Sequence, residues 1–271
     1  MAAFHCISFL TDYGLEDGFV AACHGVMARL SPAIPIIDIT HLVPPGDVRR
    51  GAAVLAQTVP YLPAGVHVAV VDPGVGTARR AIAVRAGEQV FVGPDNGVLS
   101  WAALGAGEPR RAYELTNTEL WQQPVSTTFH GRDIFAPVAA HIANGLALDA
   151  AGDEVEFDAL VALPRPTCVI TDGGAEGEVL TVDRFGNIQL SVTAADLEQV
   201  GLRAGAALAV RVGERRLSVP YREAFGSVPA GELVAYADSA GWVALAVNGG
   251  NAAGRLGLSP GARVRLTADP A

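Results

Sequence analysis

The segment VAVVDPGVGTARR (residues 68–80) decides the fold, because a run of apolar residues ends there in a carboxylate, a glycine-rich turn and two arginines. A continuous apolar run is typical of a strand that is covered on both faces, as in a parallel sheet. Open α/β sheets bind their ligands in loops at the carboxyl ends of the strands. Asp72 and Arg79 are therefore the first candidates for a catalytic site. A tight turn without function is the competing interpretation of the Pro-Gly sequence.

The chain before about residue 158 alternates strand and helix patterns. Apolar spacing predicts strands over 5–10, 34–39 and 66–71, separated by helices over 19–30 and 48–59. This βαβαβ order predicts a mostly parallel sheet flanked by helices. Later elements of the same region are expected as strands over 81–84, 90–92 and 112–115 and as helices over 99–104 and 134–144.

Shorter alternating patterns, joined by glycine and charged turns, replace the helices in the rest of the chain. They predict a smaller antiparallel β-barrel domain with strands over 177–182, 187–192, 206–212, 217–219, 233–236, 242–247 and 262–267. A linker containing two prolines, residues 163–167, separates the two regions. We therefore expect an N-terminal α/β domain over 1–160 and a C-terminal β-barrel domain over 168–271. Two domains of unlike class make a cleft between them, or between subunits, the default ligand site.

Composition excludes several classes of function. The 271 residues are 50% hydrophobic and 17% charged, which is enough apolar material for a substantial core. The formal net charge of −9 argues against a nucleic-acid partner, because phosphates would be repelled. All 19 basic residues are arginine. The absence of lysine excludes Schiff-base chemistry, anchoring of pyridoxal phosphate and a Walker phosphate loop.

Cysteine usage and hydropathy indicate the compartment. The three cysteines, Cys6, Cys23 and Cys168, are too few and too widely spaced for a zinc site or a disulfide framework. No secretory leader is recognisable at the N-terminus, and no apolar run reaches transmembrane length. We therefore predict a cytoplasmic protein that does not interact with a membrane.

Carboxylates follow three consecutive predicted strands. Asp12 follows the first strand, Asp38 and His41 lie at the end of the second, and Asp72 follows the third. In a parallel sheet these positions share one edge. Helix caps and turns are the competing explanation for other acidic residues of this region, and His130 stands just before a predicted helix.

These aspartates and histidines could instead be the metal ligands of a metal-dependent hydrolase. The ligands would be drawn from Asp12, Asp38, His41, Asp72, Asp95, His130 and Asp133. The sequence contains no close His-x-x-x-His or Asp-x-His pair, which weakens that interpretation. We expect four other histidines to be structural. His5, His24 and His67 have no acidic neighbour at a suitable spacing, and His141 lies on the helix predicted after Asp133.

Seven stretches in order resemble the S-adenosylmethionine hydroxide adenosyltransferases, which are relatives of the fluorinase and the chlorinase. Five lie in the first half of the chain, and two lie in the predicted barrel: residues 9–14, 37–41, 71–77, 92–97, 129–133, 183–187 and 248–253. The likeness extends over nearly the whole chain. It implies hydrolysis of S-adenosylmethionine to adenosine and L-methionine, and a homotrimer whose sites combine the N-terminal domain of one subunit with the C-terminal domain of the next.

The resemblance also assigns residues. Its catalytic triad falls on Asp72, Arg79 and His130. Its substrate contacts fall on Asp12 for the ribose hydroxyls, on Asp183 and Asn187 for the methionine amino group and on Ser239 for the methionine carboxylate. Phe185 is expected to pack on the substrate, and the adenine contacts fall on Asn248, Asn251 and Ala252.

The chemistry needs only a base and alignment, because water must lose a proton while methionine leaves as a neutral thioether. His130 is expected either to accept that proton or to orient the water, with Asp72 stabilising positive charge and Arg79 fixing Asp72. We expect no metal and no cofactor.

Three features leave alternatives open. The resemblance implies that the halogenases of this family carry a tyrosine where this chain has Asp72. Asp72 therefore favours water over halide as the nucleophile. By the same resemblance, Gly46 stands where relatives often carry an aromatic residue, and Ala240 stands where the fluorinase carries an arginine. Both departures are expected to affect the pocket. A protein that binds adenosyl ligands as a sensor, without catalysis, is a further alternative.

Overall fold

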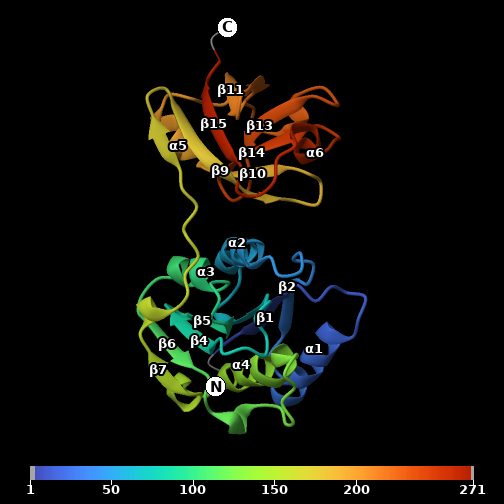
Figure 1. The fold of residues 1–271 in the computed structure, drawn as a ribbon, viewed down its shortest axis with the longest axis vertical. Helices are drawn as coiled ribbons and strands as arrows, with labels where there is room; N and C mark the ends of the chain where they lie inside the picture. Colours follow the sequence, from blue (N-terminus) through green and yellow to red (C-terminus); the bar gives the residue numbers. More distant parts are fainter. Residues whose placement is uncertain (1–3, 270–271) are drawn as a thin grey trace. The chain divides into compact units, whose positions relative to one another are not determined.

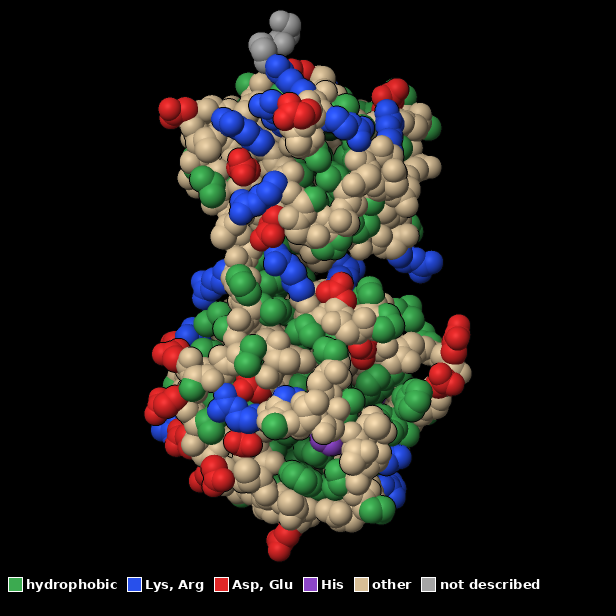
Figure 2. Space-filling view, in the orientation of Figure 1, with side chains coloured by type: hydrophobic (Ala, Val, Ile, Leu, Met, Phe, Trp, Pro, Cys, Tyr) green, Lys and Arg blue, Asp and Glu red, His purple; other side chains and the backbone are tan. Residues whose placement is uncertain are grey.

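The computed structural model describes residues 4–269. They fall into two compact units that divide the chain after residue 164, residues 4–164 and 165–269, here called the N-terminal and C-terminal units. Figure 1 shows a layered arrangement of helices and sheet in the N-terminal unit and mostly strands in the C-terminal unit. Acidic and basic side chains are interspersed on the face of each unit seen in Figure 2.

The N-terminal unit contains a seven-stranded sheet in the order β2-β1-β3-β5-β4-β6-β7. Neighbours among β2, β1, β3 and β5 pair in parallel, whereas β4, β6 and β7 pair antiparallel. Every residue of the central strands β1 and β3 is buried, as expected of continuous apolar runs. The strands are β1 (Cys6–Thr11), β2 (Ile36–Thr40), β3 (Gly65–Val70), β4 (Ala81–Ala86), β5 (Gln89–Pro94), β6 (Arg110–Glu114) and β7 (Asp153–Val155).

Helices cover both faces of this sheet (Figure 1). One core cluster joins α1 (Phe19–Leu30) and α4 (Ala136–Ala143) to one face, and a second joins α2 (Val48–Thr58) and α3 (Ser100–Gly105) to the other. The predicted α/β class with a mainly parallel sheet between helices is confirmed. Short helical turns connect these elements: η1 (Val59–Tyr61), η2 (Thr118–Leu120), η3 (Gly131–Phe135), η4 (Leu148–Ala150) and η5 (Phe157–Ala159).

The C-terminal unit is an antiparallel sheet that curls into a nearly closed barrel. Its path runs β12-β11-β15-β9-β10-β14-β13, with β8 paired to β9. A bridge between Tyr221 and Ala235 joins the two ends of the path. The predicted barrel class is therefore confirmed. The strands are β8 (Val169–Thr171), β9 (Gly174–Val182), β10 (Ile188–Thr193), β11 (Ala207–Val212), β12 (Arg215–Pro220), β13 (Leu233–Ala237), β14 (Trp242–Val247) and β15 (Arg263–Ala268).

The helices of the C-terminal unit are absent from the sequence-based interpretation. They are α5 (Ala194–Gln199), α6 (Ala252–Leu256) and the turn η6 (Phe225–Ser227). The side chain of Thr193 accepts from the Asp196 N–H while the Asp196 carboxylate accepts from the Thr193 N–H, so a capping box starts α5. Among residues 4–269, no helix has the length and hydropathy needed to cross a bilayer.

Candidate active site

The carboxyl ends of the parallel strands bring the candidate residues to one edge of the sheet. Asp12 directly follows β1, His41 directly follows β2, and Asp72 lies two residues beyond β3. Because β1 pairs in parallel with both β2 and β3, these three loops leave the sheet at the same end.

Asp72, Arg79 and His130 are in direct contact. The Nε atom of Arg79 lies 3.1 and 3.0 Å from the two carboxylate oxygens of Asp72, and its Nη2 also donates to Asp72 Oδ2. The same Nη2 lies 2.8 Å from Nδ1 of His130. The Asp72 and Arg79 side chains are only 5% and 11% exposed, so solvent screens this ion pair weakly. The guanidinium therefore joins a carboxylate and an imidazole in one fixed arrangement.

This contact determines which nitrogen of His130 carries a hydrogen. A guanidinium only donates hydrogen bonds, so Nδ1 of His130 must accept, and neutral His130 then carries its hydrogen on Nε2. Partial burial lowers the pKa of His130, and the positive charge of Arg79 lowers it further, while Asp72 and Asp133 oppose the shift. His130 is thus neutral at pH 7 and presents Nε2–H as a donor.

The segment that carries His130 is held by buried polar contacts. Asp133 is fully buried, forms an ion pair with Arg132 at 2.6 Å and accepts the Ser126 N–H at 2.8 Å. Gly131 begins the π-helical turn η3 directly after His130, and a Cβ at this position would collide with the hydroxyl of Tyr13. The close approach of Tyr13 therefore requires glycine here.

Tyr13 is a residue of this site that sequence analysis did not single out. Its ring packs against Phe19 and Phe129. Burial raises the pKa of Tyr13 well above its usual value, and the nearby Cys23, Asp12 and Asp72 raise it further. Tyr13 therefore remains a neutral hydroxyl near the carboxylate of Asp72. The position of Tyr13 between Asp12 and Gly14, within the motif that follows the first strand, could have indicated that it belongs to the site.

Asp12 is oriented by the loop before α2. Its Oδ2 accepts the Gly46 N–H at 2.8 Å, which leaves Oδ1 to bind a ligand. Gly46 has a φ of +73°, a conformation that side-chain-bearing residues rarely adopt. An aromatic residue at this position would need a different loop, so Gly46 is part of how this chain holds Asp12.

The candidate residues of the C-terminal unit form two adjoining loops. Asp183 accepts the N–H groups of Phe185 and Asn187 on Oδ1, and accepts the Asn187 side-chain amide on Oδ2, each at 2.9 Å. Asn251 caps α6 through its side-chain oxygen, which accepts the Gly254 N–H.

The two loops fit together at Gly186. This residue has a φ of +83°, and a Cβ there would collide with the Asn251 amide. Asn248 donates to the Val228 carbonyl at 2.7 Å, and Ala252 is fully buried. Phe185 is 68% exposed, and Ser239 is exposed in the turn between β13 and β14.

Both units match one known family along most of their length. Residues 7–152 match the SAM hydroxide adenosyltransferase N-terminal domain, and residues 177–265 match the corresponding C-terminal domain. The chain belongs to the S-adenosylmethionine hydroxide adenosyltransferase family. A Salinispora tropica protein named (R)-S-adenosyl-L-methionine hydrolase is 58% identical to this chain, over 99% of this chain and all of the relative.

A more distant relative and a solved structure are also similar to this chain over nearly its full length. A fluorinase from an Actinoplanes species is 29% identical over 96% of this chain and 97% of its own length. A crystal structure of an uncharacterised conserved protein from Thermotoga maritima superposes with a TM-score of 0.90 at 39% identity, over 96% of this chain and 99% of that chain. The fold and the order of the two units are therefore shared with a protein solved experimentally.

The structure weakens the interpretation that the aspartates and histidines at the strand ends are the metal ligands of a metal-dependent hydrolase. Three of the suggested carboxylates are paired with arginine: Asp72 with Arg79, Asp95 with Arg80 and Asp133 with Arg132. Among residues 4–269, the donor atoms of only one group of three metal-ligating side chains converge: those of His24, Asp38 and His41. The expectation that His24 lacks an acidic neighbour is wrong, because its Nε2 lies 2.8 Å from Asp38 Oδ1. Helix α1 and strand β2 bring together residues that are 14 positions apart in the chain.

Proposed function

We propose that this chain hydrolyses S-adenosyl-L-methionine to adenosine and L-methionine. The observation that carries the proposal is the Arg79 guanidinium held between the Asp72 carboxylate and Nδ1 of His130, beyond the end of β3. A carboxylate and an N–H donor side by side are suited to bind one water molecule, and a fixed arginine keeps both groups oriented.

The proposed reaction is a displacement at the ribose C5′ atom. A water oxygen forms a bond to C5′ while the C5′–sulfur bond breaks. The electron pair of the broken bond stays on sulfur and neutralises the sulfonium charge. The water proton passes to Asp72, and the leaving methionine needs no acid. Because neutral His130 presents Nε2–H, its role is to orient the water by donating a hydrogen bond, in preference to accepting the proton.

The remaining candidate residues are assigned to parts of the substrate. Asp12 accepts the ribose hydroxyls through the oxygen that Gly46 does not occupy. Asp183 and Asn187 bind the methionine ammonium, for which Asp183 Oδ2 retains a lone pair, and Phe185 packs on the substrate. Ser239 contacts the methionine carboxylate, and the adenine contacts are those implied by the family resemblance: Asn248, Asn251 and Ala252.

A homotrimer in the cytoplasm is part of the proposal. The proposed substrate contacts are divided between the two units, with the triad and Asp12 in one and the methionine and adenine contacts in the other. An exposed aromatic such as Phe185 is more stable when it is covered by a ligand or by another subunit. In the proposed trimer, the N-terminal unit of one subunit and the C-terminal unit of the next form each site. A solution mass of a monomer would contradict this assembly.

Neither a halide nor a metal is needed in the proposed chemistry. A carboxylate at position 72 repels an anion, so a small pocket containing it favours neutral water over chloride or fluoride. The pairing of the three carboxylates with arginine leaves the reaction to proton transfer and alignment.

The test is product analysis after incubation of the purified protein with S-adenosylmethionine, in buffers with and without chloride. Adenosine and methionine are expected in both buffers from the wild type and from the control His141→Gln, but not from Asp72→Ala. We expect His130→Ala to be strongly impaired. Formation of 5′-chloroadenosine would transfer the protein to the halogenases, and binding without any product would indicate a sensor.

A further inference from the structure

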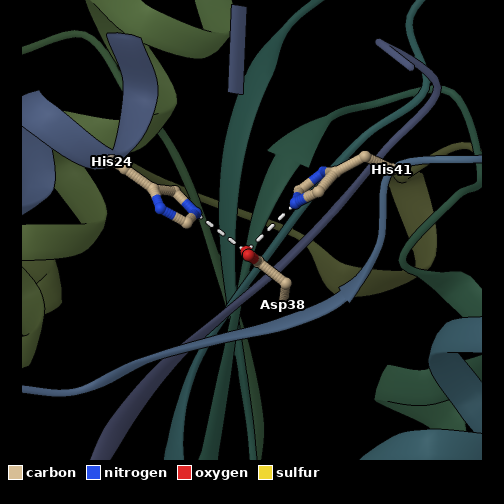
Figure 3. A group of neighbouring side chains, drawn as sticks. All are labelled: His24, Asp38 and His41. Atoms are coloured by element: carbon tan, nitrogen blue, oxygen red, sulfur yellow. Dashed lines mark hydrogen bonds and ion pairs between the residues drawn. The ribbon is translucent and has the colours of Figure 1, made fainter. Parts of the chain in front are cut away.

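Three side chains beside the first two parallel strands converge on one point, outside the proposed catalytic triad. His24 projects from α1, Asp38 lies in β2, and His41 directly follows β2. Figure 3 shows both imidazoles directed at the same carboxylate oxygen. The distances to Asp38 Oδ1 are 2.8 Å from His24 Nε2 and 3.0 Å from His41 Nε2.

His41 is held as a metal-ligating histidine usually is. Its side chain is 3% exposed, and its Nδ1 lies 2.9 Å from the hydroxyl of the buried Thr11. Such a contact on one ring nitrogen fixes the ring and leaves the other nitrogen to bind an ion. The other nitrogen, Nε2, is buried and makes no hydrogen bond of acceptable geometry within residues 4–269. Asp38 Oδ1 lies 3.0 Å away, close enough for an ionic contact, but it does not form a hydrogen bond with this buried nitrogen, and a cation held between the two atoms would satisfy both.

We propose that His24, Asp38 and His41 bind a divalent transition-metal ion of the zinc type. Two imidazoles and a carboxylate are the donors that such ions favour over Mg²⁺ or Ca²⁺. Ligand atoms about 2 Å from a tetrahedral ion lie roughly 3.3 Å apart. The two contacts of Asp38 Oδ1, at 2.8 and 3.0 Å, must therefore lengthen by a few tenths of an ångström, and the two imidazole nitrogens, which lie within 4.8 Å of each other, must adopt the same spacing. The Asp38 side chain is 44% exposed and has room to retreat by that amount. Water completes the coordination on this open side.

The ion would connect three segments that border the proposed substrate site. It joins α1 to the end of β2, and the ring of His41 contacts Thr11, the residue before Asp12. The His41 carbonyl also accepts the Gly14 N–H at 2.8 Å. Binding therefore stabilises the loop from β1 to α1, on which Asp12 and Tyr13 lie. The ion takes no part in the proposed displacement, whose triad is formed by other residues.

The test measures metal binding directly on the full chain without an affinity tag. After dialysis against a chelator, the protein is titrated calorimetrically with ZnCl₂, and with CoCl₂ while visible absorption is recorded. We expect one ion per chain, no displacement by Mg²⁺, and a rise in Tm of about 5 °C at saturating Zn²⁺.

Matched variants assign the binding to this cluster. His24→Gln and Asp38→Asn are expected to weaken Zn²⁺ binding by at least tenfold and to reduce the rise in Tm at the same Zn²⁺ concentration. His141→Gln removes a histidine of α4 outside the cluster and should bind as the wild type does. Circular dichroism checks that each variant folds. No binding at millimolar Zn²⁺, or equal affinity in Asp38→Asn and His141→Gln, would overturn the proposal, whether or not the chain hydrolyses S-adenosylmethionine.

Discussion

At the scale of single residues, the planar guanidinium of Arg79 accounts for the geometry of the triad. It donates to both oxygens of Asp72 and to Nδ1 of His130, which requires several donors in one rigid plane. Its Cζ also lies 5.3 Å from the centre of the Phe135 ring, so packing restricts its rotation. A flexible ammonium group cannot provide this set of contacts.

Arg79→Lys is therefore expected to lower kcat by about 100-fold, since charge is kept while the paired orientation of Asp72 and His130 is lost. Arg80→Lys is the matched control, because Arg80 pairs with Asp95 and donates to the Ala159 carbonyl. Adenosine formation is measured for both variants under saturating substrate. An Arg79→Lys variant with wild-type kcat would contradict the role assigned to Arg79.

The pH profile should report the neutral state of His130. Protonation of Nδ1 would remove its contact with Arg79, so activity should fall on the acid side. Because burial and Arg79 lower the pKa of His130 from 6.5, the acid limb of kcat/KM is expected below pH 6.5. The unfolded chain takes up this proton more readily, so the stability contributed by neutral His130 is present above pH 6.5 and lost as pH falls further. Rate measurements from pH 5 to 8 test this, and a limb above pH 6.5 would contradict it.

At the scale of elements, the π-helical turn η3 sets the position of His130 against Tyr13. Gly131→Ala places a methyl group in the space of the Tyr13 hydroxyl, so either the turn or the ring must move. We expect kcat/KM to fall by at least about 10-fold, because misplacing a catalytic group by about 1 Å has effects of that order or larger.

The control for Gly131→Ala is Gly25→Ala, since a Cβ at Gly25 in α1 meets no atom within 4 Å. This variant should keep its activity and gain about 0.5–1 kcal/mol of unfolding free energy. Equal activities of the two alanine variants would show that the contact with Tyr13 does not matter.

Helices and strands could be predicted from the sequence where the pattern of apolar residues was unambiguous. The helix predicted over 19–30 has those bounds in the structure, because its apolar spacing and the following Ser-Pro leave little choice. The buried runs of β1 and β3 were recognised within one residue at each end.

Other elements depend on contacts that local patterns do not contain. Strands β7 and β8 have three residues each, and their positions follow from pairing with β6 and β9. Helix α5 did carry a local signal, the Thr-x-x-Asp capping box, but its six residues are too short for apolar periodicity. The pairing of His24 with Asp38 depends on how α1 packs beside β2, which spacing along the chain cannot reveal.

At the scale of the whole molecule, the proposed trimer predicts complementation between inactive chains. Asp72→Ala disables the N-terminal contribution to a site, and Asp183→Ala disables the C-terminal contribution. If each site combines units from two subunits, random mixed trimers retain intact sites at about a quarter of positions. Co-expression with two different tags, purification of the mixed oligomers and an adenosine assay measure this fraction. Mixed oligomers without activity would contradict sites shared between subunits.

The order of elements in the N-terminal sheet has a consequence for the newly made chain. Strand β1 lies between β2 and β3, so it can pair with residues 36–40 early, but its second edge stays unpaired until residues 65–70 have been synthesised. Helix α1 covers part of the sheet face that carries Phe9, and the cover of this face is complete only when α4 is added, at residues 136–143. A ribosome-bound chain that stops before α4 thus exposes part of this apolar face, which favours aggregation. The C-terminal unit, made last, has all its strands within about 100 consecutive residues, and it can therefore form soon after its synthesis ends.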